Sequence, residues 1–268
     1  MSLYQKILES KPYFLIAGPC VIEDYDVIYT IAEKIARWTR DRGITYIFKA
    51  SYLKANRTSD SSFSGPGLEK GIETLSQIKK EFNLPILTDI HESNEAEPVS
   101  EVADILQIPA FLARQTYLLK SAAKTGRIVN VKKGQFMAPE DMKGAVDKIT
   151  SEGNKQIILT ERGTSFGYHN LVVDFRSFPI LKQNGYPVVY DVTHSMQRPS
   201  LNGISGGSPE YVPMMAKAAM ATGMVDGLFV EVHPDPKTAL SDSQSMIKLD
   251  TLERMLDDLL EIRRKTDA

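Results

Sequence analysis

The chain has 268 residues, of which 42% are hydrophobic and 25% are charged, the composition of an ordinary globular protein. Its formal net charge of -2 provides no general attraction for nucleic acid or anionic membranes, so an anionic ligand has to be bound by a local group of cations. The single cysteine excludes an internal disulfide framework. The amino-terminal MSLYQKILESK lacks the apolar stretch of a signal peptide, and no run of about 18 apolar residues is present. We therefore expect a soluble cytoplasmic protein with no membrane or nucleic-acid partner.

Eight short runs rich in β-branched and aromatic residues recur along the chain, separated by stretches long enough for a helix and its loops. They are YFLIA from Tyr13, YIFKA from Tyr46, PILTD from Pro85, ADILQI from Ala103, IVNVK from Ile128, IILTE from Ile157, PVVYD from Pro187 and GLFVEV from Gly227. Helical patterns such as 26–43, 68–82 and 209–223 lie between them and end at Gly43, Asn83 and Gly223. This alternation predicts an α/β fold, a (β/α)8 TIM barrel, with residues 1–268 as a single catalytic domain.

Nearly every predicted strand is apolar until its carboxyl end, where polar or charged residues follow. These ends supply Gly18, Pro19 and Cys20; Lys49; Asp89 and His91; Gln107; Lys132 and Lys133; Glu161 and Arg162; Asp191 and His194; and Glu231 with His233. One such residue alone could be a solvated strand end, but eight such positions indicate a site at the carboxyl ends of the strands. The polar segment from Lys54 to Gly67 is long for a turn, and we expect it to fold over a ligand.

A metal site is predicted where the first, seventh and eighth strands meet. Cys20, His194 and Glu231 follow these strands, and Asp242 lies in the loop after the eighth. Closure of a barrel makes the three strands neighbours, so a thiolate, an imidazole and two carboxylates can converge on one divalent ion. This mixed ligand set suits zinc, iron(II), manganese or cobalt better than magnesium. The alternative is that Cys20 is a small buried apolar residue and His194 a hydrogen-bonded loop residue.

An anion site is predicted at the same end of the barrel. Six cations lie at strand ends or in the loops after them: Lys49, Lys54, Arg57, Arg114, Lys132 and Arg162. Cations that face into one barrel mouth repel one another unless anions bind between them. Two phosphates and a carboxylate would satisfy them, because arginine binds phosphate through two parallel hydrogen bonds and lysine acts as a point charge. A scattered, solvated arrangement of these side chains is the alternative.

Nine segments, in order from Ile16 to Asp242, carry a resemblance to one enzyme family. They are IAGPCVIE, FKASYLKANR, TDIHE, ILQIPAFLARQT, VNVKKGQF, LTERGTSFGYHNLVVD, DVTHSMQ, SGG and VEVHPDPKTALSD. Together they resemble the 3-deoxy-D-manno-octulosonate 8-phosphate synthases, also named 2-dehydro-3-deoxyphosphooctonate aldolases. The resemblance implies a homotetrameric barrel transferase that joins phosphoenolpyruvate, D-arabinose 5-phosphate and water. The implied products are 3-deoxy-D-manno-octulosonate 8-phosphate, for the inner-core sugar of lipopolysaccharide, and inorganic phosphate.

The resemblance also implies roles for individual residues. Metal-dependent members carry cysteine after the Gly-Pro pair and metal-independent members carry asparagine at the equivalent position, so Cys20 implies the metal-dependent branch. The implied metal ligands are Cys20, His194, Glu231 and Asp242; phosphoenolpyruvate would bind Lys49, Lys54, Lys132 and Arg162. The aldose phosphate would bind Asn56, Arg57, Thr58, Ser205 and, from an adjacent subunit, Arg114. Lys54, His194 and Cys20 are the implied catalytic residues, with Lys54 placed to protonate the developing aldehyde oxygen.

Some residues depart from the usual pattern of the family, several of them near the aldose end. Ser64 and Pro209 stand where arginine is common, Tyr117 stands where aspartate is usual, and Arg198 is inserted after His194. The metal and phosphoenolpyruvate motifs are intact. These departures therefore concern the acceptor sugar rather than the type of reaction.

Three other functions are weighed against this one. The 3-deoxy-D-arabino-heptulosonate 7-phosphate synthases share the barrel but use erythrose 4-phosphate, and typically read KPRTS where this chain reads KANRTS. Ala55 and Asn56 favour the five-carbon acceptor, while Thr58 points the other way. Sialic-acid-type synthases, which use an unphosphorylated amino sugar, are disfavoured by Arg57 and Arg114. A non-catalytic homologue that binds a sugar phosphate would be expected to lose metal ligands, and all of them are present.

Overall fold

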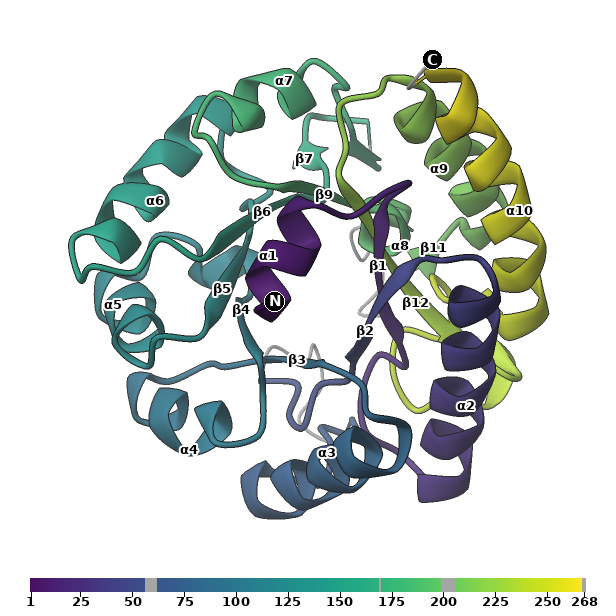
Figure 1. Ribbon diagram of the computed structural model, residues 1–268, viewed down its shortest axis with the longest axis horizontal. Coiled ribbons are helices and arrows are strands. Elements are labelled where there is room, and N and C mark those ends of the chain that lie inside the picture. Colours follow the sequence, from purple (N-terminus) through teal and green to yellow (C-terminus); the bar gives the residue numbers. More distant parts are fainter. Residues whose placement is uncertain (56–61, 169, 199–205, 267–268) are drawn as a thin grey trace.

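A computed structural model describes residues 1–55, 62–168, 170–198 and 206–266, and every structural statement below concerns these residues. Eight parallel strands pair in the order β1-β2-β3-β4-β5-β6-β9-β12, and β12 pairs with β1 to close a barrel. They are β1 (Phe14–Gly18), β2 (Thr45–Lys49), β3 (Ile86–Asp89), β4 (Ile105–Ile108), β5 (Ile128–Lys132), β6 (Ile157–Glu161), β9 (Val188–Asp191) and β12 (Gly227–His233). The predicted TIM barrel is confirmed, with helices around its outside (Figure 1).

Each of the helical patterns predicted at 26–43, 68–82 and 209–223 forms a helix, and further helices lie before, between and after the strands. The helices are α1 (Leu3–Leu8), α2 (Tyr25–Asp41), α3 (Leu68–Phe82), α4 (Ala96–Ser100), α5 (Thr116–Lys124), α6 (Met142–Thr150), α7 (Ser177–Lys182), α8 (Val192–Ser195), α9 (Val212–Ala221) and α10 (Leu249–Thr266). Gly43, Asn83 and Gly223 have φ angles of 67°, 51° and 67°, the left-handed conformation that ends a helix. No helix in the described part of the chain is long and apolar enough to cross a membrane.

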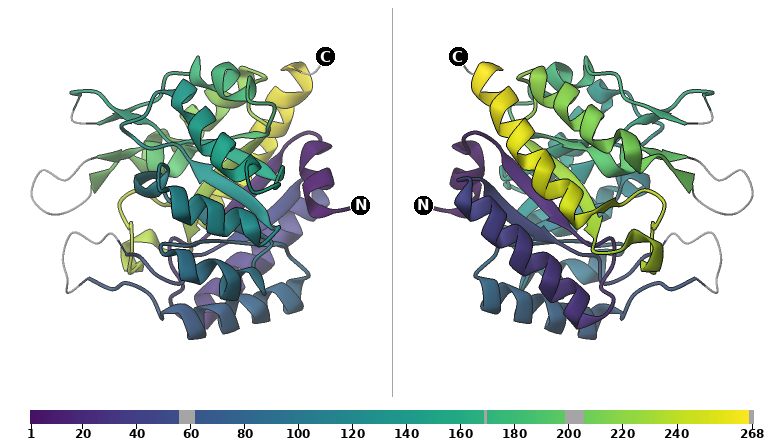
Figure 2. Two further views of the ribbon diagram at one scale, coloured as in Figure 1. Left: turned by 90° about the vertical axis from the view of Figure 1, so that its left-hand side faces the viewer. Right: turned by 90° about the vertical axis from the view of Figure 1, so that its right-hand side faces the viewer.

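Several short elements were not predicted, because strands of two residues have no periodicity to detect. They are the hairpin of β7 (Thr164–Ser165) and β8 (Leu171–Val172), the hairpin of β10 (Gln197–Arg198) and β11 (Gly206–Gly207), and β13 (Ile247–Lys248), which pairs with the end of β12. Short 3-10 helices are η1 (Ser93–Glu95), η2 (Ala110–Leu112), η3 (Pro139–Asp141), η4 (Pro209–Tyr211) and η5 (Pro236–Thr238). Both hairpins lie at the end of the barrel opposite α1 (Figure 2).

The interior of the barrel changes from apolar to charged along its axis. Ile47 and Phe229 belong to the inner apolar cluster, and the residues two positions further along the same strands are Lys49 and Glu231. Residues i and i+2 of a strand point to the same face, so both pairs point inward. All four residues are at most 1% exposed. The strands therefore place ionised groups inside the barrel only near their carboxyl ends.

Helix α1 covers the opposite, apolar end (Figure 1). Ile7 is 2% exposed and joins the inner cluster. The Tyr4 hydroxyl donates a hydrogen bond to the carbonyl oxygen of Ile157 in β6 at 3.1 Å. The amino-terminal segment thus packs as part of the fold and closes the end at which the barrel interior is apolar.

We predict that Gly18→Ala destabilises the fold, because a Cβ at Gly18 would lie 1.9 Å from the carbonyl oxygen of Lys49. This neighbour is backbone of the adjacent strand and cannot rotate away, so the free energy of unfolding should fall by about 1–3 kcal/mol or more. Gly144→Ala in α6 is the matched control, because nothing lies within 4 Å of its Cβ position. That change should stabilise by about 0.5–1 kcal/mol. Urea denaturation of both variants tests this, and equal stabilities would contradict it.

Candidate functional site

Three possible metal ligands meet at the carboxyl end of the barrel. One ligand atom from each of Cys20, Glu231 and Asp242 lies within 4.8 Å of the others. Cys20 follows β1 and Glu231 lies in β12, two strands that are paired through Gly18 and Glu231. Asp242 comes from the loop between β12 and β13. The closure of the barrel brings these residues together, as the spacing along the chain predicts.

His194, at α8 directly after β9, lies beside this group. Its Nε2 is 3.5 Å from Glu231 Oε2 and 3.8 Å from Asp242 Oδ2, and Cys20 Sγ is 3.3 Å from Asp242 Oδ2. Ligand atoms around a tetrahedral zinc ion are roughly 3.3–3.8 Å apart, given bonds of about 2.0–2.3 Å. Glu231 Oε2 is buried and has no hydrogen-bond partner in the described part of the chain. The spacing and the unpaired carboxylate oxygen both fit a divalent metal ion.

The charge states within this group differ. Burial, and after it the carboxylates of Asp242 and Glu231, raises the pKa of the Cys20 thiol well above its usual value. Burial also disfavours ionised Glu231, but the positive charges of His194 and Lys49 outweigh it and lower the pKa of this carboxyl. Cys20 is therefore a thiol whose ionisation requires further positive charge, which a bound metal ion supplies.

Two buried lysines approach the same group. Lys49, 1% exposed, forms an ion pair with Glu231 Oε1. Lys132, 5% exposed, forms an ion pair with Asp191 Oδ2, and its Nζ lies 3.6 Å from the centroid of the Phe229 ring. Burial lowers the pKa of Lys132, although Asp191 opposes this. The negative face of an aromatic ring favours a cation, so Phe229 also helps to hold this ammonium group.

Arg162, after β6, is 4% exposed and carries an unused donor. Its Nη2 donates a hydrogen bond to Gln197 Oε1 at 2.8 Å, while its Nη1 is buried without a hydrogen-bond partner among the residues described. Gln197 Nε2 donates in turn to Asp242 Oδ2 at 3.3 Å. A guanidinium group with one nitrogen unpaired is arranged to bind an anion. Gln197 was not among the predicted site residues, and nothing in its spacing marks it as the link between Arg162 and Asp242.

Asp191, the last residue of β9, orients two of the predicted site residues. Its Oδ2 is 2.7 Å from His194 Nδ1, and its Oδ1 accepts the backbone N–H of His194 at 2.9 Å. The same carboxylate is the partner of Lys132. Histidines that bind metals usually donate their second ring N–H to such a carboxylate, which fixes the tautomer and the ring orientation. Its strand-end position placed Asp191 at the predicted site without a specific role, and its three-residue spacing from His194 was a usable signal for that role.

Lys54 begins the segment predicted to fold over a ligand. Its backbone N–H donates to the carbonyl oxygen of Ser64 at 2.7 Å, which joins the two sides of that segment. Burial disfavours the charged ammonium, but the nearby carboxylates of Asp89, Glu231 and Asp242 raise the pKa of Lys54 above its usual value. Lys54 is therefore a protonated lysine close to the possible metal ligands.

The residues predicted to bind the aldose phosphate are not brought together here. Asn56, Arg57, Thr58 and Ser205 lie outside the described residues. Arg114 follows η2 and its side chain is exposed, while its carbonyl oxygen accepts a hydrogen bond from Lys148 Nζ at 2.8 Å. Tyr117 is 83% exposed, and Pro209 begins η4. The aldose end of the site stays a prediction.

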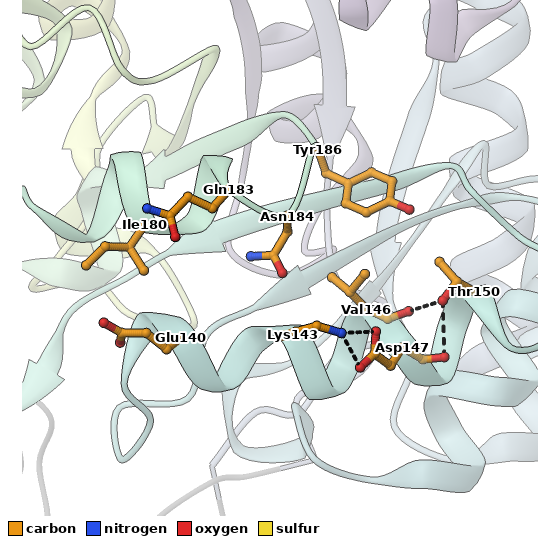
Figure 3. A pocket seen from close by; sticks show the side chains of 9 residues that line it. All are labelled: Glu140, Lys143, Val146, Asp147, Thr150, Ile180, Gln183, Asn184 and Tyr186. Carbon is orange, nitrogen blue, oxygen red and sulfur yellow. Dashed lines mark hydrogen bonds and ion pairs between the residues drawn. The ribbon is translucent and has the colours of Figure 1, made fainter.

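A surface groove between α6 and α7 is separate from this site (Figure 3). Its lining includes Lys143, whose Nζ is paired with Asp147 at 2.7 and 2.6 Å, so this cation already has its counter-charge. No residue predicted for binding or catalysis is among the described side chains that line the groove. The groove therefore has no part in the site at the barrel mouth.

Comparison with known proteins places the chain in a family. Residues 5–267 match the DAHP synthetase I family. The chain is 54% identical over 254 residues to a 2-dehydro-3-deoxyphosphooctonate aldolase of Desulfatibacillum aliphaticivorans, covering 94% of this chain and 93% of that protein. It is 52% identical over 258 residues to the protein of that name from Geobacter sp. (strain M21), covering 96% and 94%. The resemblance to this family is confirmed. The chain belongs to the DAHP synthetase I family and, within it, to the 2-dehydro-3-deoxyphosphooctonate aldolases.

Proposed function

We propose that this chain condenses phosphoenolpyruvate with D-arabinose 5-phosphate and water, forming 3-deoxy-D-manno-octulosonate 8-phosphate and inorganic phosphate with the help of a divalent metal ion. The observation that carries this proposal is a pair of buried atoms without partners in the described part of the chain. Glu231 Oε2 belongs to an anionic side chain and accepts no hydrogen bond, while Arg162 Nη1 belongs to a cationic side chain and donates none. Gln197 and Asp242 connect the two positions. One site for a metal ion beside one site for an anionic substrate is what the metal-dependent form of this condensation requires.

The phosphate and carboxylate of phosphoenolpyruvate would lie between Lys49, Lys54, Lys132 and Arg162. Lys49 and Lys132 already have carboxylate partners, so they act as fixed positive charges, whereas Arg162 has a nitrogen free to bind the substrate directly. These residues orient the substrate and stabilise developing charge, and form no covalent bond to it.

The chemistry forms a bond between C3 of phosphoenolpyruvate and the aldehyde carbon of the sugar, while water adds at C2. The resulting hemiketal phosphate then loses phosphate. Lys54, held protonated by its acidic neighbours, would donate a proton to the aldehyde oxygen as negative charge develops there. Cys20, His194, Glu231 and Asp242 would hold zinc, iron(II), manganese or cobalt, and the bound ion supplies Lewis acidity toward the aldehyde carbonyl or toward water.

A homotetramer is also proposed, in which Arg114 reaches the aldose phosphate of an adjacent subunit together with Asn56, Arg57, Thr58 and Ser205. Exposed aromatic residues at the same end of the barrel support a contact surface between subunits. Phe136 is 58% exposed and Phe166 is 73% exposed. Their loops adjoin, because the Ser165 N–H donates to the carbonyl oxygen of Gln135 at 3.0 Å.

The acceptor sugar is tested by a paired assay, since the DAHP synthetase name of the family also admits erythrose 4-phosphate. We expect phosphate release from phosphoenolpyruvate to be faster with D-arabinose 5-phosphate than with erythrose 4-phosphate at equal concentrations. The relatives at 52% and 54% identity carry the octonate aldolase name, which supports this order. Faster turnover of erythrose 4-phosphate would contradict the proposal.

Metal dependence is tested by removing the ion and, separately, one of its ligands. Treatment with a chelator should abolish phosphate release, and addition of zinc, iron(II), manganese or cobalt should restore it. Cys20→Ala should abolish activity without recovery, because the thiolate ligand is then missing. Metal content measured on the purified proteins provides a readout independent of turnover. Activity that survives both treatments would refute the metal assignment.

Asp191→Asn tests the orienting role of Asp191. The change removes the charge next to Lys132 and weakens the hold on His194, so we expect a loss of about 10–100-fold in metal affinity or activity. Asp174→Asn is the control, because Asp174 forms an exposed ion pair with Arg176 and should change neither quantity. Metal titration and steady-state kinetics measure both effects. Equal behaviour of the two variants would show that Asp191 has no such role.

A further inference from the structure

A carboxylate outside the proposed ligand set contacts the segments that carry three of the ligands. Glu23 lies three residues after Cys20, and its side chain is 6% exposed. Its Oε1 accepts a hydrogen bond from the backbone N–H of Leu240 at 2.9 Å. Its Oε2 lies 3.6 Å from His233 Nε2. One buried carboxylate therefore connects the segment after β1 to the last residue of β12 and to the loop that follows it.

Both partners of Glu23 lie close in the sequence to a proposed metal ligand. His233 lies two residues after Glu231 at the end of β12, and Leu240 lies two residues before Asp242. Glu23 thereby restrains both ends of the intervening loop at 234–239 through these contacts. The loop is also fixed at its start, because His233 Nδ1 is 2.7 Å from the carbonyl oxygen of Asp235. Each contact of Glu23 lies within three residues of a proposed metal ligand.

The far end of this loop needs such a restraint. Asp242 has a φ of 47°, a left-handed conformation that is costly for a residue other than glycine and persists only where the surroundings impose it. Ser241, just before it, has its Oγ 3.0 Å from Cys20 Sγ. Asp242 and Glu231 are both acidic and converge on this thiol, so the repulsion between their like charges works against this arrangement.

We propose that Glu23 is a positioning residue that holds the loop carrying Asp242 against Cys20 and Glu231, so that the metal site is organised before the ion binds. Glu23 acts through Leu240 and His233 and does not itself bind the metal. This role rests on the proposed function, because it presupposes that Cys20 and Asp242 are metal ligands. Its removal weakens metal binding while the ligands themselves remain present.

The test compares Glu23→Gln with the parent chain and with Glu33→Gln. Glu23→Gln keeps the size of the side chain but removes the charge that faces His233; Glu33 is an exposed residue of α2 and serves as the charge-matched control. Zinc affinity is measured by competition with a chromogenic chelator. We expect Glu23→Gln to lower it by about 10–100-fold, the range for residues that support metal ligands, and Glu33→Gln to leave it unchanged.

Two further readouts separate positioning from loss of the site. At saturating metal, Glu23→Gln should recover a kcat close to that of the parent chain. Titration with cobalt(II) should give the thiolate-to-cobalt absorption band at the parent intensity, reached at higher cobalt concentration. Zinc affinity equal in Glu23→Gln and the parent would overturn the role of Glu23 and leave the metal site standing. Zinc binding that is unchanged by Cys20→Ala would overturn the metal site and the role of Glu23 with it.

Leu240→Pro provides a second variant should Glu23→Gln fail to fold. The change removes the backbone N–H of Leu240, which donates a hydrogen bond to Glu23, and leaves Glu23 itself in place. Leu240 is 51% exposed, and Ala239 has a ψ of 138°, which suits a residue that precedes proline. The same fall in zinc affinity is expected, and an unchanged affinity would overturn the proposal.

Discussion

The pairing of charges that are held out of water at one end of the barrel is the constraint on which the rest of the structure depends. A lone buried ion costs several kcal/mol, so Lys49 and Lys132 can lie inside the barrel only because Glu231 and Asp191 lie next to them. Removal of one partner from such a pair typically costs about 3–5 kcal/mol. The pairs therefore come at the expense of stability, and the apolar parts of the fold have to offset that cost.

The division of the barrel interior along its axis provides this compensation. Residues such as Ile47 and Phe229 fill the apolar part of the barrel interior, on the side that α1 covers. Ile7 of α1 joins them from the amino-terminal segment. Phe229 serves both halves, since its ring packs in the apolar cluster while Lys132 Nζ lies over its face. A charged site and a stable core coexist because the two-residue periodicity of each strand lets its side chains change character within one step.

The eight strands and the main helix ends could be predicted because each depends on local chemistry. A strand that is buried on both faces is apolar along most of its length. A helix that ends in the left-handed conformation favours glycine or asparagine at that position, as at Gly43, Asn83 and Gly223. The convergence of Cys20 with Glu231 also followed, because barrel closure fixes which strands are neighbours. The partners of the buried lysines did not follow, since these depend on which side chains meet across the barrel interior. The plug formed by the six-residue α1 likewise has too few residues to show a pattern.

Gln197 illustrates a choice of residue type that spacing could not reveal but chemistry explains. Its amide oxygen accepts a hydrogen bond from Arg162, and its amide nitrogen donates one to Asp242. A glutamate at this position could accept from Arg162, but it would repel Asp242 and would neutralise the charge of Arg162. A lysine or arginine could donate to Asp242, but it would repel Arg162. Only a neutral side chain with both a donor and an acceptor joins the two groups without changing the charge of either. The bridge therefore leaves Arg162 cationic and Asp242 anionic, at positions separated by a single side chain.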